Sequence, residues 1–273
     1  MAGAQKSSRI VGKPVVGTAA ATTKVPRKLK VVVGQGEDIR EFVVRESQVA
    51  TRSKSFSDAL REGPKDTAEI VLELPDDDPQ VFALYSKLLD TGTVPALQEI
   101  QNRTHIGDDG HIYCRNRSAC MIEYHTLVGL YVFARQIADV KAQNAAIDGV
   151  IAKVTHESTT VVNPHAGPCL PTVGAIKTMY SQTKKHCPGR QAILDCFVWY
   201  GQAETLHECG SWIEAPPEEF MLDLARNLMS LRNQPTQNIP HHDLTRYHEP
   251  EGEDYEWDMM PWSSMEHYQG FSN

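Results

Sequence analysis

The first part of the chain with a recognisable pattern of apolar residues predicts β-strands. Residues 30–33 and 41–44 are runs of β-branched and aromatic residues, separated by turn-forming residues from Gly34 to Asp38. This pattern predicts a β-hairpin. Apolar and polar residues alternate at 68–74, which predicts a further strand.

Helical spacing appears on both sides of that further strand. Two short helices are expected at residues 47–50 and 53–61, and Ser53 is placed to cap the second. Pro79 follows Asp78 where another helix should start, and apolar positions at helical spacing extend it to Leu89. The order is therefore hairpin, two short helices, strand and helix.

From residue 123 onward the apolar positions repeat with the period of an α-helix. A helix pair is expected at residues 123–137 and 140–154, with a break near Ala138 and Asp139. Three further helices are expected at about residues 172–181, 190–205 and 217–232. The last can begin at Pro217, because proline is tolerated in the first helical turn.

These elements predict an α+β fold that is mostly helical, with a small sheet capped by helices and a helical C-terminal extension. The expected parts are a basic disordered tail at 1–28, a domain at 29–157 with an insertion loop at 96–122, a helical extension at 158–232, and an acidic disordered tail at 233–273. Neither tail has a periodic apolar face that would offset the entropy of ordering it.

Composition and charge narrow the possible functions. The chain has 273 residues, 41% of them hydrophobic and 23% charged, which is typical of a globular protein. No stretch approaches the ~18 apolar residues of a membrane span. The net charge of −8 argues against a body that binds nucleic acid. The first 30 residues differ, with seven basic residues and no acidic one.

The cellular compartment follows from the N-terminus and the cysteines. Lys13, Pro14 and Gly17 interrupt the first apolar stretch, so it does not resemble a secretory signal. We therefore expect a cytoplasmic or nuclear protein whose six cysteines are thiols. The acidic C-terminal residues include aromatic side chains from Tyr255 to Trp262, which suit a short docking segment that orders on a partner.

Several short motifs resemble those of a BTB/POZ domain, in the divergent form common in filamentous fungi. They are Phe42-Val-Val44, Thr51-Arg-Ser53-x-x-Phe56, Ile70-Val-Leu72-x-Leu74-Pro75, Asp78-Pro79-x-Val-Phe82, Leu88-Leu-x-Thr91-Gly92, Leu130-Tyr-Val-Phe-Ala134 and Asp139-Val-Lys-x-x-Asn144. The stretch Asp195-x-Phe197-x-Trp199 resembles the helical extension of those fungal proteins. The resemblance covers most of residues 30–232 and implies a BTB fold for residues 29–157.

The resemblance implies a non-enzymatic protein-interaction module. It would act as a substrate adaptor for a cullin-RING ubiquitin ligase or as a self-associating scaffold, and a chromatin-associated regulator that uses the basic N-terminal arm is a further alternative. The implied partner-binding residues are Phe56, Leu60 and Glu62, because cullin-binding members carry an apolar residue, any residue and Glu at this helix end. A structural interpretation is equally open, with Leu60 in the core and Glu62 a solvated charge.

The sequence contains no motif that favours an enzyme or a bound cofactor. The sequence has no Gly-x-Ser-x-Gly, His-Glu-x-x-His, Cys-x-x-Cys or phosphate-loop pattern, and Gly34-x-Gly36 fits a turn better than a nucleotide site. The metal-ligand candidates are His105, His111, Cys114 and Cys120 in the insertion loop, Asp76, Asp77 and Asp78 at a helix start, and His241, His242, Asp243 and His248 in the acidic tail. None has the spacing of a closed zinc site, so no metal is expected.

Overall fold

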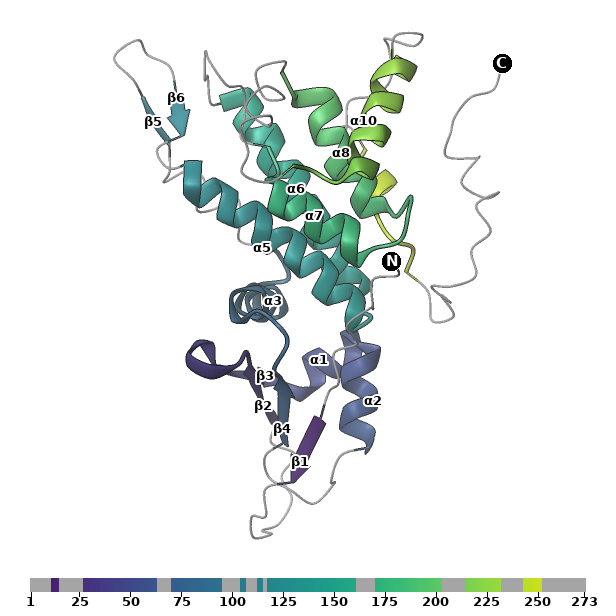
Figure 1. Cartoon of the computed structure of the whole chain (residues 1–273). Helices are drawn as coiled ribbons and strands as arrows, with labels where there is room; N and C mark the ends of the chain where they lie inside the picture. Colours follow the sequence, from purple (N-terminus) through teal and green to yellow (C-terminus); the bar gives the residue numbers. More distant parts are fainter. Residues whose placement is uncertain are drawn as a thin grey trace.

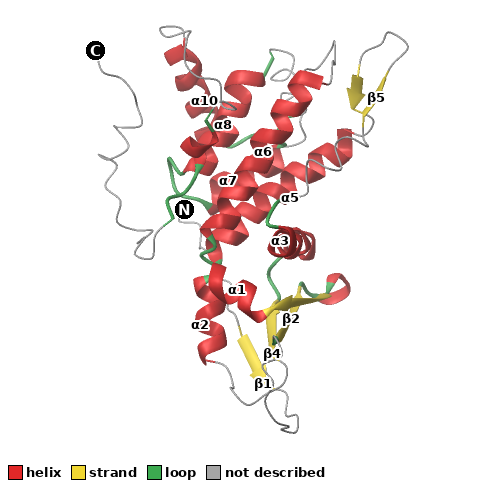
Figure 2. Cartoon of the chain, turned by 180° about the vertical axis from the view of Figure 1, so that it is seen from behind, coloured by secondary structure: helices red, strands yellow, loops and turns green. Residues whose placement is uncertain are grey.

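The computed structural model has a mixed α+β fold that is mostly helical, as predicted (Figure 1). It describes residues 11–14, 27–62, 70–94, 104–106, 112–114, 117–160, 170–202, 215–231 and 243–251. The sheet and the helices α1 and α2 lie at one end, the long helices lie at the other, and α3 lies between them (Figures 1 and 2). In the described part of the chain, no helix is both long and apolar enough to cross a membrane.

The larger sheet is built around a central parallel pair of strands. Its strands are β1 (Val11–Pro14), β2 (Lys28–Val33), β3 (Arg40–Arg45) and β4 (Ile70–Leu74), in the order β1-β4-β2-β3. Strand β2 is antiparallel to β3 and parallel to β4, so Val31 lies opposite both Phe42 and Leu72. The predicted hairpin and the predicted third strand are confirmed.

The turn between β2 and β3 explains the two glycines at its start. Gly34 has a φ of 92° and Gly36 a φ of 62°, values that L-residues with a side chain rarely adopt. A Cβ atom at Gly34 would also lie 2.9 Å from Cγ of Pro79. Both glycines therefore serve the turn, as the sequence suggested, and Gly34 also permits the close approach of α3.

The short helices α1 (Glu46–Arg52) and α2 (Lys54–Glu62) follow β3. The Ser53 hydroxyl accepts a hydrogen bond from the Phe56 amide at 3.1 Å, which confirms the predicted cap. The same hydroxyl donates to the Ile137 carbonyl at 2.6 Å. The start of α2 is thus tied to the end of a helix far along the chain.

Helix α3 (Pro79–Thr91) joins the sheet to the helical part. Its N-terminus is capped by the Asp78 carboxylate, which accepts from the Gln80 amide at 2.7 Å. The Phe82 ring lies 4.9 Å from Phe42 of the sheet and 5.8 Å from Phe133 of the helical part, centroid to centroid. A Cβ atom at Gly129 would lie 2.7 Å from a Val81 methyl group, so this glycine permits close packing.

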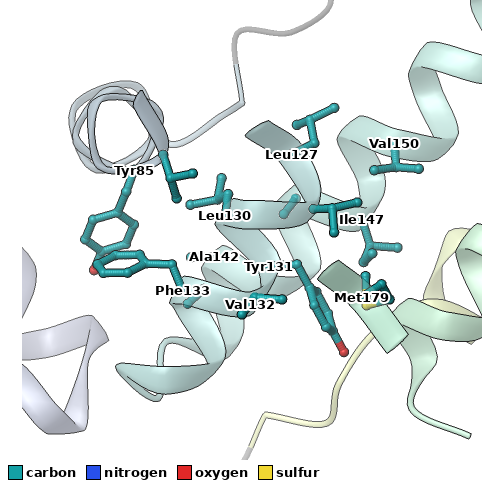
Figure 3. Packing of buried hydrophobic residues seen from close by; sticks show 14 of the residues in the cluster. Tyr85, Leu127, Leu130, Tyr131, Val132, Phe133, Ala142, Ile147, Val150 and Met179 are labelled. Atoms are coloured by element: carbon teal, nitrogen blue, oxygen red, sulfur yellow. The ribbon is translucent and has the colours of Figure 1, made fainter. Parts of the chain in front are cut away.

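The helical part is centred on the predicted helix pair. Its helices are α5 (Arg117–Gln136), α6 (Val140–Thr160), α7 (Val173–Gln182), α8 (Pro188–Tyr200) and α10 (Glu218–Leu231). The chain breaks between α5 and α6 at Ala138, whose φ is 55°, as the pattern predicted. Figure 3 shows Phe133 of α5 beside Tyr85 of α3, whereas Tyr131 lies on the side of Met179.

Two of the predicted element boundaries between the tails are wrong. The predicted insertion loop at 96–122 contains a small antiparallel sheet of β5 (Thr104–Ile106) and β6 (Ile112–Cys114), and α5 already begins at Arg117. Helix α8 ends at Tyr200 and not near residue 205, because residues 201–202 are not helical.

Both predicted tails contain ordered residues, so they are not disordered throughout. Residues 11–14 form β1, which pairs antiparallel with β4. Residues 243–251 return to the body and include a short 3₁₀ helix, η4 (Leu244–Tyr247), which packs against α6 and α8. Their contacts were missed because they involve few residues and do not follow any periodic pattern.

Candidate functional site

The partner-binding residues implied by the family resemblance lie on α2. Phe56 is 0% exposed and belongs to the core, so its assignment as a partner contact is wrong. Leu60 is half-buried and packs against the same core, which places it between the two alternatives left open by the sequence. The side chain of Glu62, the last residue of α2, lies outside the described residues.

The side chains of the metal-ligand candidates in the predicted insertion loop also lie outside the described residues. His105 and Cys114 lie on the paired strands β5 and β6 and Cys120 on α5, but their side chains are not described, and neither is any part of His111. Among the described side chains, no group of three or more His, Cys, Asp or Glu residues is suited to hold a metal ion. His241 and His242 likewise lie outside the described residues.

The three acidic residues before α3 have separate structural positions. Asp78 caps the helix, and Asp76 accepts a hydrogen bond from the Gln35 amide at 3.2 Å. Burial, together with the neighbouring charge of Asp76, raises the pKa of the Asp77 carboxyl to about 6. One of its oxygens is buried without a hydrogen-bond partner. These residues shape the turn and do not converge on a common point.

A buried carboxylate at the α5–α6 break connects the two ends of the molecule. Asp139 is fully buried and accepts from Nε of Arg52 at 3.1 Å and from the Tyr85 hydroxyl at 3.0 Å. It also caps α6 by accepting from the Ala142 amide at 2.9 Å. The arrangement satisfies the buried charge, and its contacts are those of a structural node.

The most elaborate polar site in the described chain binds residues 243–251, which we call the C-terminal segment. Four residues form what we call the docking face: Tyr131 of α5, Asn144 and Asp148 of α6, and Asp195 of α8. Asn144 and Asp148 are four residues apart, so they lie on one side of α6. Polar residues at this spacing within apolar helices were the only sequence signal for the site.

The docking face recognises the backbone of the C-terminal segment at one residue. The Asn144 side-chain amide donates to the Glu249 carbonyl at 3.0 Å, and its oxygen accepts from the Glu249 amide at 2.7 Å. This pair of bonds holds an extended chain without regard to its side chain. The C-terminal segment therefore needs no neighbouring strand to satisfy these backbone groups.

The same face recognises side chains of the C-terminal segment. The Tyr247 ring is 0% exposed, and its hydroxyl donates to Oδ2 of Asp195 at 2.7 Å. Arg246 forms an ion pair with the same Asp195 oxygen at 3.1 Å. The Glu249 carboxylate accepts from the Tyr131 hydroxyl at 2.6 Å. His248, expected in a solvated tail, lies 2.8 Å from a carboxylate oxygen of Asp148.

Burial shifts the pKa values of the titratable groups at this site. It raises the pKa of the Asp195 carboxyl, against the opposing effect of hydrogen bonds from Tyr247 and Gln191 and of the Arg246 charge. It raises the pKa of the Glu249 carboxyl as well, against the hydrogen bond from Tyr131. Burial also raises the phenol pKa of Tyr131 and Tyr247, so both remain neutral hydrogen-bond donors.

Comparison of the chain with protein-family models, with curated proteins and with solved structures gives no match. The geometry therefore has to support a function by itself. The described residues contain one helix end at the surface, an outer strand with the exposed apolar residue Val43, and a face that binds residues 243–251.

Proposed function

We propose that the protein is a non-enzymatic protein-interaction module of the BTB type. The observation that supports this proposal is the order and pairing of the elements in residues 28–91. The hairpin strand β2 pairs with both β3 and β4, the helices α1 and α2 lie between β3 and β4 in the sequence, and α3 follows. This is the order that the motifs led us to expect of the family.

Within this class, we propose a substrate adaptor that binds a cullin through the C-terminal end of α2. The side chains of Asp58 and Arg61 are 44% and 74% exposed, so this end of the helix faces solvent. Leu60 presents part of its surface beside them. A half-buried apolar side chain with charged neighbours is the composition of a small interaction hot spot.

The test is direct binding of the purified full-length chain to the N-terminal domain of a cullin, measured by calorimetry at about 10 µM. Glu62→Lys should weaken binding at least about tenfold, because it reverses the charge that the family resemblance implies at the cullin interface. Glu37→Lys is the matched control, since it makes the same charge change on the exposed turn beyond β2. Wild-type protein that does not bind at this concentration would exclude the adaptor role.

A self-associating scaffold is the second candidate, and the outer strand β3 favours it. Val43 is 63% exposed, and the described strands leave the outer edge of β3 without a partner. Such an edge can pair with a second sheet. Light scattering at about 100 µM should detect a dimer that Val43→Lys dissociates. A wild-type monomer at that concentration would exclude this candidate.

A further inference from the structure

The C-terminal segment is held in the way that a protein holds a bound peptide. Within the described chain it belongs to neither sheet, and its principal backbone contact is the amide of a single side chain, Asn144. Two of its side chains, Tyr247 and Glu249, are buried, while His248 between them is only half-buried. The segment therefore lies on the surface as a short 3₁₀ turn that ends at Tyr247, followed by extended chain from His248.

The docking face is complementary to a particular order of side chains. Asp195 faces a base and a phenol, supplied by Arg246 and Tyr247. The Tyr131 hydroxyl faces a carboxylate two residues further on, supplied by Glu249. Asp148 faces the imidazole of His248 at the edge of the face, where the contact is partly exposed. The recognised pattern is therefore Arg-Tyr-x-Glu.

We propose that the docking face is a binding site for Arg-Tyr-x-Glu segments of partner proteins that form a short 3₁₀ turn and continue as extended chain, and that the C-terminal segment is its intramolecular ligand. Partners would bind by displacing residues 243–251. The docking face contains no residue of α2 or β3, so the test of this proposal is independent of the tests of the cullin and self-association proposals.

The character of the contacts makes exchange of ligands feasible. Hydrogen bonds and ion pairs to side chains of the docking face hold the C-terminal segment, together with packing of Tyr247 and Leu244 against the hydrophobic core. Water replaces such bonds when they open, so their net contribution is a small fraction of their gross strength. The segment is joined to α10 by residues 232–242, a tether that supplies a high effective concentration without a further contact.

The charges of the docking face restrict which side chains the partner segment can carry, whereas the contacts to its backbone do not. Two carboxylates, Asp148 and Asp195, lie at the docking face where the C-terminal segment places His248 and Arg246. A segment with acidic residues at these two positions would meet like charges. The occupant is therefore a linear segment with a basic residue immediately before its tyrosine and an acidic residue two positions after it.

The test uses the full-length chain and a fluorescent peptide with the sequence of residues 243–251. Tyr247→Ala should free the docking face, so the peptide should bind this variant at least about tenfold more tightly than wild type, in which the tethered segment competes. Adding Asn144→Ala to Tyr247→Ala should remove that gain. A peptide with alanine in place of both Tyr247 and Glu249 is the matched control and should not bind.

Hydrogen exchange on the wild-type protein provides a second test that needs no variant. The Glu249 amide, which donates to Asn144, should exchange at least about a hundredfold faster than the slowest amides of α5, because local opening releases it without global unfolding. Equal protection of the two would show that the segment is a fixed part of the fold and would overturn the proposal. Failure of the peptide to bind the folded Tyr247→Ala variant would also overturn it.

A second copy of the chain is the other source of an Arg-Tyr-x-Glu segment, and light scattering distinguishes it. Light scattering should give the same oligomeric state for wild type and Tyr247→Ala, because the segment is docked within its own chain. A wild-type dimer that Tyr247→Ala converts to a monomer would show that copies exchange their C-terminal segments, and it would overturn the assignment to a partner protein.

Discussion

At the scale of single residues, two buried carboxylates have opposite consequences for stability. Asp139 has an ion pair with Arg52, a hydrogen bond from Tyr85 and a helix N-terminus beside it. Asp77 is partly buried in the turn before α3, and one of its oxygens has no hydrogen-bond partner. Burial costs a carboxylate free energy unless partners replace the lost water, so the first is compensated and the second is not.

Replacing Asp77 should therefore stabilise the protein at alkaline pH. The pKa of Asp77 is raised to about 6 from 3.8, so the folded state binds a proton more readily than the unfolded state. Asp77→Asn should raise the free energy of unfolding by about 2 kcal/mol at pH 8, after allowance for the partly exposed side chain. The gain should fall toward zero as the pH is lowered through 6 to 4.

Urea unfolding of wild type and Asp77→Asn across that pH range measures the difference. Asp90→Asn is the control, since it makes the same chemical change at an exposed residue near the far end of α3. A stabilisation by Asp77→Asn that does not change with pH would contradict the assignment to the carboxylate.

Removing Asp139 should have the opposite effect. Asp139→Ala leaves the Arg52 guanidinium and the Tyr85 hydroxyl without their shared acceptor, and it removes the cap of α6. We expect a loss of about 3 kcal/mol in the free energy of unfolding. Thermal or urea unfolding measures it. The Arg52→Ala, Asp139→Ala double variant should lose less than the sum of the two single variants, and strict additivity would show that the two residues are not coupled.

At the scale of elements, the contact between the C-terminal segment and α5 is sensitive to pH. Burial raises the pKa of Glu249, so docking of the segment favours the protonated carboxyl. A group whose pKa is raised by docking contributes more stability as the pH falls through that pKa.

Protection of residues 243–251 from hydrogen exchange, corrected for intrinsic rates, should thus rise as the pH is lowered from 7.5 to 5.5. The increase should be at most about tenfold per pH unit for each group that titrates. Glu249→Gln should reduce this pH dependence while retaining an acceptor for the Tyr131 hydroxyl. Protection that falls with decreasing pH would contradict the proposed role of Glu249.

At the scale of the whole molecule, one hydrophobic core joins the sheet to the helical part. Buried residues of a single cluster run from Leu29 in β2, through Leu130 in α5, to Met179 in α7 and Tyr247 in η4. The boundary expected at residue 157 falls within α6, a helix that packs on both α5 and α8. The described residues from β2 to α10 should therefore unfold as one cooperative unit, from which residues 243–251 can open locally.

Hydrogen exchange in low concentrations of denaturant checks this prediction. The slowest amides of β2 and of α7 should reach the same limiting free energy of opening. Leu130→Ala, in the fully buried middle of α5, should lower both by about 3 kcal/mol. Separate limits for the two elements, with only one lowered by the substitution, would instead support two domains.

The sequence by itself determined the α+β class and most of the elements, because the information is local. The period of apolar residues located the hairpin, β4, α3 and the α5–α6 pair, and the caps at Ser53 and Asp78 were evident from residue type. Likewise Gly34 and Gly36 were recognisable as turn residues, because few other residues adopt a positive φ.

Only the tertiary structure decided which side chains meet across long distances in the chain. Asn144 and Glu249 are 105 residues apart, and Asp195 and Tyr247 are 52 apart, so no periodic pattern links them. Phe56 was assigned to a partner, but the packing of α2 places it in the core. The C-terminal segment was expected to be disordered for lack of an apolar face. It is ordered because Tyr247 joins the hydrophobic core and because a complementary polar surface, assembled from three helices, replaces the water that its backbone and charged groups would otherwise bind.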